Sequence, residues 1–241
     1  PISYQEQSDV LQEYMAVVHG DFLKDHLLEG NKNKEKEVEK SDKEIMDELR
    51  KNPRKINTSD FIGPSSYTLQ IGNIVPVNEK YTTPNVRENF TVTDKADGER
   101  KLLFISDTGN IYLIDTNMNV AYTGTRTLEK TLFYSILDGE HIKHDRNGKF
   151  INRYAAFDLY YVNKKSIREF AFYPDSEGDD KEEKDEEKEK EDPMKYRLPL
   201  LKHFIELLKP VSIFEAAEKG EVTPNENKQT TNFMIKCKTF K

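Results

Sequence analysis

The chain has 241 residues, of which 34% are charged and 35% hydrophobic, so it is polar for a single compact globule. Its net charge of −7 arises from residues 175–192, which hold 12 acidic and 4 basic side chains, and the acidic balance is therefore no evidence against a nucleic acid partner. The single cysteine, Cys237, excludes a disulfide framework and a cysteine-rich zinc site and indicates a reducing compartment, and no apolar run approaches the ~20 residues that a membrane helix needs.

The first segment with a regular pattern is helical. Residues 8–30 place apolar side chains at helical spacing, with Ser8 as the expected cap and Gly20 as the expected end of the first helix. A shorter helical piece is expected to continue as far as Gly30. Residues 31–40 are charged and contain almost no apolar side chain, which is typical of a solvated linker.

A second helix follows this linker. Ser41 and Glu44 have the spacing of a capping box, which predicts a helix over residues 42–51. No residue pattern in this first part of the chain indicates chemistry. We therefore interpret residues 1–58 as a helical, charged linker region and residues 59–241 as the folded domain.

From residue 67 onward the pattern changes to that of β-strands. Short runs rich in β-branched and aromatic residues alternate with turn residues. The segment Asp107–Asn110 separates two of these runs and is typical of a hairpin turn. Strands in close succession joined by tight turns predict antiparallel sheets rather than alternating βαβ units. The runs cover residues 67–75, 90–95, 101–106, 111–116, 120–125, 132–137, 154–162 and 233–237.

Two further segments complete the expected fold. Residues 198–209 have apolar side chains at helical spacing and are followed by Pro210, which predicts a helix. The acidic segment 175–192 contains no apolar side chain to anchor it, so we interpret it as a disordered insertion. The expected fold class is α+β, with antiparallel β-sheets and flanking helices.

The motif that points to chemistry is Lys95-x-Asp97-Gly98-x-Arg100, between two predicted strands. A lysine amine is a nucleophile only when it is neutral, so a catalytic Lys95 needs a site that lowers its pKa through neighbouring cations or desolvation. Gly98 permits a positive φ in the turn, and Asp97 is expected to bind the local backbone. The turn directs Arg100 towards the same pocket, where a guanidinium can hold a ribose hydroxyl or a phosphate. A surface hairpin with ordinary charges is the alternative, since Asp-Gly is common in turns.

Two later segments strengthen the chemical interpretation of this motif. They are LDGEHI at residues 137–142 and YAAFDL at residues 154–159. In order and spacing, the three segments resemble motifs I, III and IIIa of the covalent nucleotidyltransferase superfamily, which unites mRNA capping enzymes with ATP-dependent DNA and RNA ligases. From about Ser59 onward the chain is most similar to the guanylyltransferase domain of mRNA capping enzymes of large DNA viruses. The resemblance implies that residues 59–241 are the N-terminal part of a nucleotidyltransferase domain.

The resemblance also implies roles for individual side chains. Lys95 would form the phosphoramidate to the α-phosphorus, and Arg100 would bind the ribose or the phosphates of the incoming strand. Glu140 would contact the ribose hydroxyls or help to place a divalent metal, with a plain strand-end carboxylate as the alternative. Phe157 would stack on the purine, with core packing as the alternative. Asp158 would orient its neighbours by hydrogen bonding.

The same resemblance implies the ligands and partners. GTP would be the substrate, and Mg²⁺ or Mn²⁺ would bridge phosphate oxygens and neutralise charge on the leaving pyrophosphate. RNA with a 5′-diphosphate end would accept the nucleotide, and no membrane partner is expected. Fused triphosphatase and methyltransferase domains and a cytoplasmic location, in the viral factory or virion of a large DNA virus, are also implied.

The chain departs from the family pattern after motif IIIa. It shows no acidic-Gly strand of motif IV, and residues 235–238 match only superficially the Lys-x-Lys strand of motif V, whose lysines hold the α-phosphate. We therefore interpret residues 233–240 as an earlier strand. We expect the chain to stop before motifs IV and V and the OB-type domain, and to bind nucleotide poorly by itself. Asp115 and Thr116 stand where related enzymes often present an arginine, which would shift a phosphate contact to a residue such as Arg126.

Two other functions are compatible with parts of the pattern. An ATP-dependent polynucleotide ligase would use the same Lys95, because both enzyme classes share motif I. A non-catalytic module could retain the fold to bind RNA ends or a partner subunit. The intact trio of Lys95, Arg100 and Glu140 argues against that module, because it would have no chemical need for these residues.

Deletion of residues 176–191 tests the interpretation of the acidic segment. A flexible loop adds little to the entropy of chain closure, ~0.6 kcal/mol per doubling of its length. We therefore expect the midpoint of thermal unfolding, followed by circular dichroism, to change little. Loss of soluble protein on deletion would show that the segment is part of the folded structure.

Overall fold

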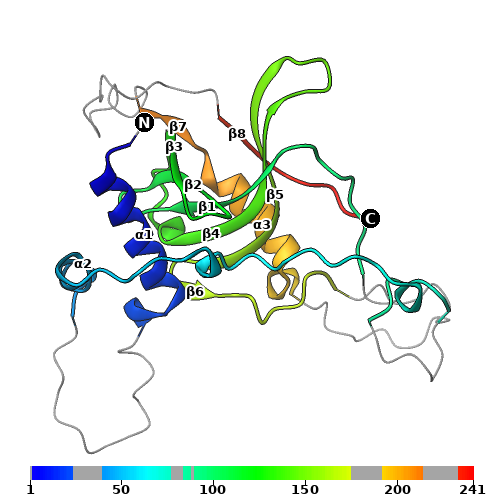
Figure 1. The fold of residues 1–241 in the computed structure, drawn as a ribbon, viewed down its shortest axis with the longest axis horizontal. Helices are drawn as coiled ribbons and strands as arrows, with labels where there is room; N and C mark the ends of the chain where they lie inside the picture. Colours follow the sequence, from blue (N-terminus) through cyan, green and yellow to red (C-terminus); the bar gives the residue numbers. More distant parts are fainter. Residues whose placement is uncertain (1, 24–39, 77–83, 88–89, 175–191, 214–232) are drawn as a thin grey trace, which may run out of the picture.

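The computed structural model describes residues 2–23, 40–76, 84–87, 90–174, 192–213 and 233–241 (Figure 1). The expected linker over residues 31–40 and the acidic insertion over residues 175–192 lie almost entirely outside these residues, as does the short helical piece expected before Gly30. Among the described helices, none has the length and apolar character needed to cross a membrane.

Helices flank a centre that is rich in strands. The helices are α1 (Tyr4–Val18), α2 (Asp42–Lys51) and α3 (Arg197–Leu208). Short 3-10 turns occupy Asp21–Leu23, Thr58–Asp60, Ile71–Asn73, Lys130–Leu132 and Pro193–Lys195. The strands are β1 (Glu99–Ile105), β2 (Asn110–Asp115), β3 (Val120–Arg126), β4 (Ser135–His144), β5 (Phe150–Val162), β6 (Lys165–Ser166), β7 (Val211–Ser212) and β8 (Met234–Cys237).

The strands of the described residues form one eight-stranded sheet. Its order is β6-β5-β4-β1-β2-β3-β7, and β8 joins it by pairing with β5. The pairs along this order are antiparallel, whereas β5 and β8 are parallel. The predicted hairpin between β1 and β2 is confirmed, and Gly109 supplies the positive φ of 80° that its turn requires. The α+β class with an antiparallel sheet is therefore confirmed.

The sheet lies between α1 and α3. Successive side chains of a strand point to opposite faces, and β1 divides accordingly. Leu102 and Phe104 pack in a core with α1, whereas Leu103 and Ile105 pack in a second core with α3. Both faces of the sheet centre are thus buried, which explains why β1 is apolar without alternation in its second half.

The N-terminal helices are partly as predicted. The helix over residues 42–51 is confirmed, with both hydrogen bonds of the capping box between Ser41 and Glu44. The first helix begins earlier than expected, at Tyr4, because the Ser3 side chain rather than Ser8 accepts the capping hydrogen bond from Glu6.

The first helix shares the core of the sheet. Val10, Leu11 and Tyr14 are buried against strand residues such as Phe104. The Tyr14 and Phe104 rings meet edge to face, with centroids 6.2 Å apart. The boundary expected at residue 58 therefore does not separate two cores, and α1 is part of the domain rather than of a linker.

Two predicted strands do not form. Residues 67–75 contain a 3-10 turn, in which the Asn73 side chain accepts from the Gln70 backbone at 2.8 Å and donates to the Pro84 carbonyl at 2.8 Å. Residues 90–95 contribute only a single bridge, between Thr93 and Phe240. Strand propensity needs a neighbouring strand to bury the side chains, and the described residues provide none along most of the length of these two segments.

Tyr14 joins α1 to the segment that leads towards the sheet. Its hydroxyl donates to the Asp60 carbonyl at 2.7 Å and accepts from the Ile62 backbone at 3.2 Å, and its side chain is fully buried. We expect Tyr14→Phe to lower the free energy of unfolding by about 1–3 kcal/mol, because two buried backbone groups lose their partner. Chemical denaturation measures this difference. Tyr4→Phe, on an exposed ring of the same helix, is the control and should change nothing measurable. Equal stability of Tyr14→Phe and the unaltered chain would contradict the prediction.

Candidate active site

Lys95 lies in the turn that leads into β1. Its side chain is 87% exposed, and its Nζ lies 2.9 Å from Oδ1 of Asp97. The hydrogen bond and charge of Asp97, with a smaller contribution from Glu140, raise the pKa of the Lys95 amine above its usual value. The expectation that the site lowers this pKa is wrong for this structure, because the charged groups that act on the amine are carboxylates.

Gly98 brings this turn against β4. Its backbone N–H donates to Oε1 of Glu140 at 3.0 Å. A Cβ at this position would lie 2.7 Å from the carbonyl oxygen of His141 and 2.8 Å from Cγ of Glu140, so a larger residue would force the turn away. Gly98 does not have the positive φ that the sequence predicted. Glycine is needed here for close approach to β4, and the approach joins the Lys95 turn to Glu140.

Arg100 is held by Asp138 on the adjacent strand. Arg100 lies opposite Glu140 in the β1–β4 pair, and Asp138 precedes Glu140 by two residues on the same face. Nε and Nη2 of Arg100 bind Oδ1 and Oδ2 of Asp138 at 3.2 and 2.5 Å, which makes a bidentate pair. The Asp138 side chain is fully buried and also accepts from the Tyr160 hydroxyl at 2.7 Å. This network fixes the guanidinium in one orientation.

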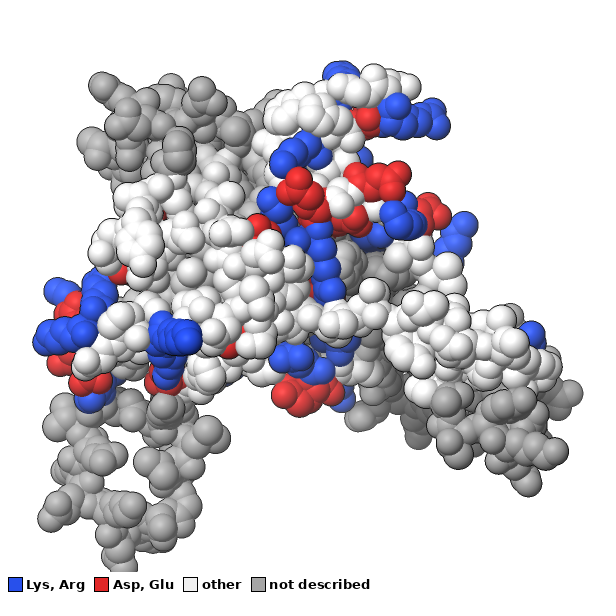
Figure 2. All heavy atoms as spheres, viewed as in Figure 1, with Lys and Arg blue, Asp and Glu red and all other residues white. Residues whose placement is uncertain are grey.

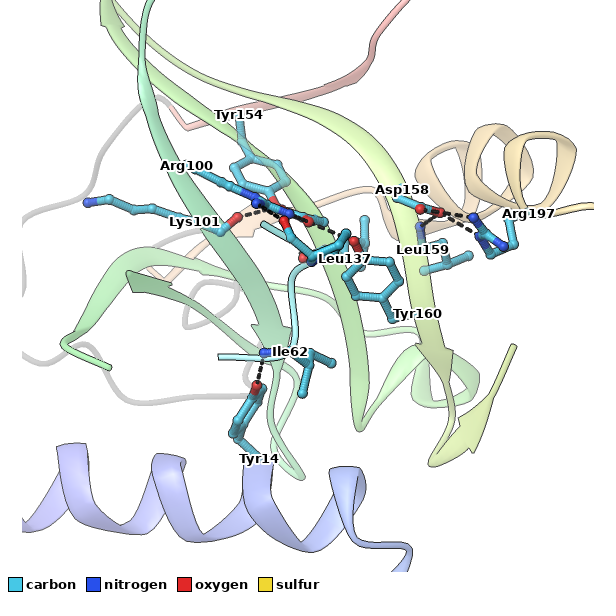
Figure 3. A network of polar contacts seen from close by, with 12 residues as sticks. Tyr14, Ile62, Arg100, Lys101, Leu137, Tyr154, Asp158, Leu159, Tyr160 and Arg197 are labelled. Atoms are coloured by element: carbon cyan, nitrogen blue, oxygen red, sulfur yellow. Dashed lines mark hydrogen bonds and ion pairs between the residues drawn. The ribbon is translucent and has the colours of Figure 1, made fainter. Parts of the chain in front are cut away.

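The segment before the sheet closes over the same guanidinium. Nη1 of Arg100 donates to the Pro64 carbonyl, and the guanidinium carbon lies 5.6 Å from the centroid of the Phe61 ring. Ile62 in the same segment is bound by Tyr14 of α1, so one chain of contacts runs from α1 to Arg100 (Figure 3). The expected contact of Arg100 with ribose or phosphate therefore has to use the N–H groups that Asp138 and Pro64 leave free.

Two cations lie near the Phe157 ring. The guanidinium carbon of Arg100 is 5.8 Å from its ring centroid, and Nζ of Lys238 is 6.0 Å from it. The ring is half-buried, so core packing does not account for all of its surface. An aromatic ring beside two cations suits a planar base that carries phosphates, through stacking and charge.

Strand β8 brings two lysines to this face. Lys236 is in register with Ala155 of β5, and the Lys238 backbone N–H donates to the Ala156 carbonyl at 2.7 Å. Ile235 and Cys237 pack into the core shared with α3, so the alternating Lys236 points to the opposite face, which carries Arg100. Beyond β8, Lys241 exchanges two backbone hydrogen bonds with Val92, at 2.9 Å each, three residues before Lys95. The segment after β8 thus pairs with the residues that lead to Lys95.

Asp158 orients a neighbouring side chain, as expected, whereas Arg126 lies away from Arg100. Asp158 binds Arg197 at the start of α3, with Nε to Oδ1 at 2.8 Å and Nη2 to Oδ2 at 3.2 Å, so it anchors that helix to β5 (Figure 3). Arg126 lies opposite Asn110, at the end of β2 remote from Asp115, the residue paired with Lys101. The phosphate contact suggested for Arg126 is therefore wrong, because strand register places it at the far end of the sheet.

The acidic groups fit a metal that is held mainly by a nucleotide. The described residues contain no cluster of three or more His, Cys, Asp or Glu that could enclose a metal ion. Mg²⁺ in phosphate-transfer sites is often bound by one or two carboxylates together with substrate phosphates and water. Glu140 fits that role: Oε1 accepts from Gly98, while the carboxylate remains partly exposed beside the Lys95 turn.

The sequence did not reveal three of the groups that build the site. Asp138, Tyr160 and the Pro64 carbonyl orient Arg100, but none of the motif roles named them. A signal was available for Asp138, because a carboxylate in an apolar strand two residues before Glu140 must share its face and needs a cation. The Pro64 contact depends on a loop whose path no local pattern encodes.

Sequence comparisons identify the family of this chain. Residues 85–222 match the mRNA capping enzyme catalytic domain family, and because this is more than half of the chain, the chain belongs to that family. It is also similar to a probable mRNA-capping enzyme of Acanthamoeba polyphaga mimivirus, with 33% identity over 100 residues. That match covers 42% of this chain and 8% of the viral protein, so the chain spans a small part of its relative.

Asp97→Asn tests what controls the Lys95 amine. Because Asp97 is the main cause of the raised pKa, its neutralisation is expected to lower the Lys95 pKa towards the usual lysine value. The measurement is an NMR titration of the Lys95 side chain in isotopically labelled protein. Asp94→Asn, which removes an exposed carboxylate one residue before Lys95, is the matched control and should change the pKa less. A Lys95 pKa that stays the same or rises in Asp97→Asn would refute this assignment.

Proposed function

We propose that this chain carries the nucleotide-binding part of an mRNA guanylyltransferase, which transfers GMP from GTP to a 5′-diphosphate RNA end through Lys95. The observation that carries the proposal is the convergence of Lys95, Arg100, Glu140 and Phe157 at one end of the sheet, in a chain of the mRNA capping enzyme catalytic domain family. The family match favours capping over the ATP-dependent ligase that shares the Lys95 motif.

The first step is a displacement at the α-phosphorus of GTP. The neutral Nζ of Lys95 attacks this phosphorus, the bond to the β-phosphate oxygen breaks, and pyrophosphate leaves with the bonding electron pair. The amine loses its proton and a phosphoramidate remains. In the second step, a terminal oxygen of the 5′-diphosphate RNA attacks the same phosphorus, the P–N bond breaks, and Lys95 recovers a proton.

The protonation state of Lys95 controls the first step. Its ion pair with Asp97 at 2.9 Å stabilises the ammonium form, which cannot attack. Loading therefore requires that the proton leave, and the fraction of neutral amine grows as pH rises towards the raised pKa. The rate of loading is expected to increase from pH 6 to pH 9. Lys236 and Lys238, which β8 brings to the face that carries Arg100, would hold the α-phosphate once the amine is neutral.

The side chains around the nucleotide would hold it in the orientation needed for attack by Lys95. Arg100 is fixed by Asp138, so its free N–H groups are preorganised for a ribose hydroxyl or phosphate. Phe157 would stack on the guanine, and Glu140 would bind ribose hydroxyls or hold Mg²⁺ or Mn²⁺. A bound divalent metal would neutralise charge on the phosphates of the leaving pyrophosphate. Triphosphatase and methyltransferase activities that precede and follow this reaction would reside in other domains.

Covalent labelling tests the proposal. The chain, in excess over GTP labelled at the α-phosphate and with Mg²⁺ present, should retain label that survives alkali and is lost in acid, as a phosphoramidate requires. Lys95→Ala should abolish the label. Lys95→Arg should abolish it as well, because a guanidinium keeps the charge but stays protonated and cannot attack.

The controls separate the alternatives. Lys130→Arg, on an exposed turn away from the site, should label like the unaltered chain. ATP labelled in the same way should give far less product than GTP, and the reverse result would indicate a polynucleotide ligase. Label that persists in Lys95→Arg would exclude Lys95 as the nucleophile, and a chain that binds RNA without any label would be a non-catalytic module.

A further inference from the structure

Strands β4 and β5 extend beyond the rest of the sheet as a two-stranded hairpin. The pairing of β1 with β4 ends at Glu99 opposite His141, and the pairing of β8 with β5 begins at Arg153. Within the described part of the chain, residues 143–152 therefore pair only with one another, and the hairpin stands out from the molecule (Figure 1). An isolated hairpin of this kind is marginally stable in water, so its projection indicates a role outside the core.

The turn of this hairpin is well ordered by its own residues. Oδ1 of Asp145 accepts from the backbone N–H groups of Asn147 and Lys149 at 2.8 and 3.0 Å. Gly148 has a φ of 78°, which suits a tight turn. The Asp145 carboxylate thus binds backbone N–H groups of the turn, and the basic side chains of the hairpin face the solvent.

Those basic side chains make the projecting end cationic. Lys143, Arg146 and Lys149 are exposed, with Asp145 as the acidic residue among them. Within the described part of the chain, no ion pair involves Arg146 or Lys149, whereas Lys143 shares Glu99 with Lys101. Figure 2 shows Lys and Arg side chains on the projecting end of the molecule, with an acidic side chain beside them. A polyanion is the natural partner for such a surface.

An exposed aromatic ring lies among these cations. The Phe150 side chain is 58% exposed, and the His144 ring meets it edge to face with centroids 5.6 Å apart. At the base of the hairpin, a groove of about 310 Å³ runs past Phe150, Lys101, Lys143 and His141. Nδ1 of His141 is buried and has no hydrogen-bond partner among the described residues. Cations interleaved with aromatic rings are typical of surfaces that bind single-stranded nucleic acid.

We infer that the β4–β5 hairpin and the groove at its base bind the single strand of RNA that follows the 5′ end. This inference rests on the proposed function, which requires an RNA end at Lys95. Glu140, which binds the Lys95 turn, and Lys143, which begins the exposed cationic surface, are three residues apart on β4, so their side chains point to opposite faces of the strand. Beyond His141, β4 pairs with no described strand other than β5, so an RNA strand that leaves the nucleotide site passes over this free edge of β4 to reach Lys143 and the groove. Phe150 stacks on a base, and Arg146 and Lys149 contact phosphates.

Equilibrium binding measures this surface independently of catalysis. The probe is a fluorescein-labelled, single-stranded 12-nucleotide RNA with a 5′-hydroxyl end, and the readout is fluorescence anisotropy of the 241-residue chain at several salt concentrations. Arg146→Ala with Lys149→Ala should weaken binding about tenfold and reduce the slope of log affinity against log salt by about 1.4, because two phosphate contacts are lost. Phe150→Leu should weaken binding without changing the slope, because a base loses its aromatic partner but no charge is removed.

The matched control is Lys130→Ala with Lys165→Ala, which removes two exposed lysines away from the hairpin. It should bind RNA like the unaltered chain, and circular dichroism should show every variant folded. Equal losses in the hairpin and control variants would overturn the inference, as would unchanged binding in the hairpin variants. Binding of duplex RNA as tight as that of the single strand would also overturn it.

Covalent labelling of the same variants separates this inference from the proposed function. All three variants should still form the lysyl-nucleotide with GTP, because none of their changes touches the nucleotide site. If the variants are labelled normally and the hairpin substitutions do not change RNA binding, the hairpin inference is refuted and the proposed function is not. Hairpin-dependent RNA binding in a chain that GTP never labels would refute the proposed function while retaining the hairpin as an RNA surface.

Discussion

The site depends on the ion pair between Arg100 and Asp138. Asp138 is fully buried in β4, and such a carboxylate is tolerated only when a cation and hydrogen bonds compensate it. Arg100 supplies two hydrogen bonds and Tyr160 a third. Removal of one partner from a buried pair typically costs about 3–5 kcal/mol, so the pair constrains both strands. The guanidinium is therefore part of the folded core as well as of the nucleotide site.

Other elements of the site are arranged around this pair. The segment with Phe61 and Pro64 covers the guanidinium, and Tyr14 holds that segment to α1, so a helix without chemistry of its own stabilises the site. The Phe157 ring lies near both the Arg100 guanidinium and the Lys238 amine. Unlike Tyr14, Arg100 and Phe157, Lys95 is exposed, and it lies on a turn that Gly98 and Glu140 hold to β4. A rigid cradle with an accessible nucleophile suits a reaction in which two substrates must reach the same lysine in turn.

Much of this arrangement was predictable from sequence, for physical reasons. Local signals identified the Ser41 capping box, the hairpin at Gly109 and the helix after residue 197, because each depends on neighbouring residues. Residues 67–75 do not form the predicted strand, because the described residues provide no partner strand for their β-branched and aromatic side chains. The motifs located Lys95, Arg100 and Glu140, but not the raised pKa of Lys95 or the position of Lys238, which both depend on groups brought together by strand pairing. Register across β4, β5 and β8 is a long-range property that no local pattern specifies.

The proposed reaction requires Lys95 to become covalently bonded to a nucleotide. The most direct measurement is tandem mass spectrometry of peptides from the chain after incubation with GTP and Mg²⁺, with digestion kept at alkaline pH to preserve a phosphoramidate. We expect GMP on the peptide that contains Lys95, with fragment ions that assign it to that lysine. GMP assigned to Lys101, Lys236 or Lys238 instead would contradict the role of Lys95 as the nucleophile.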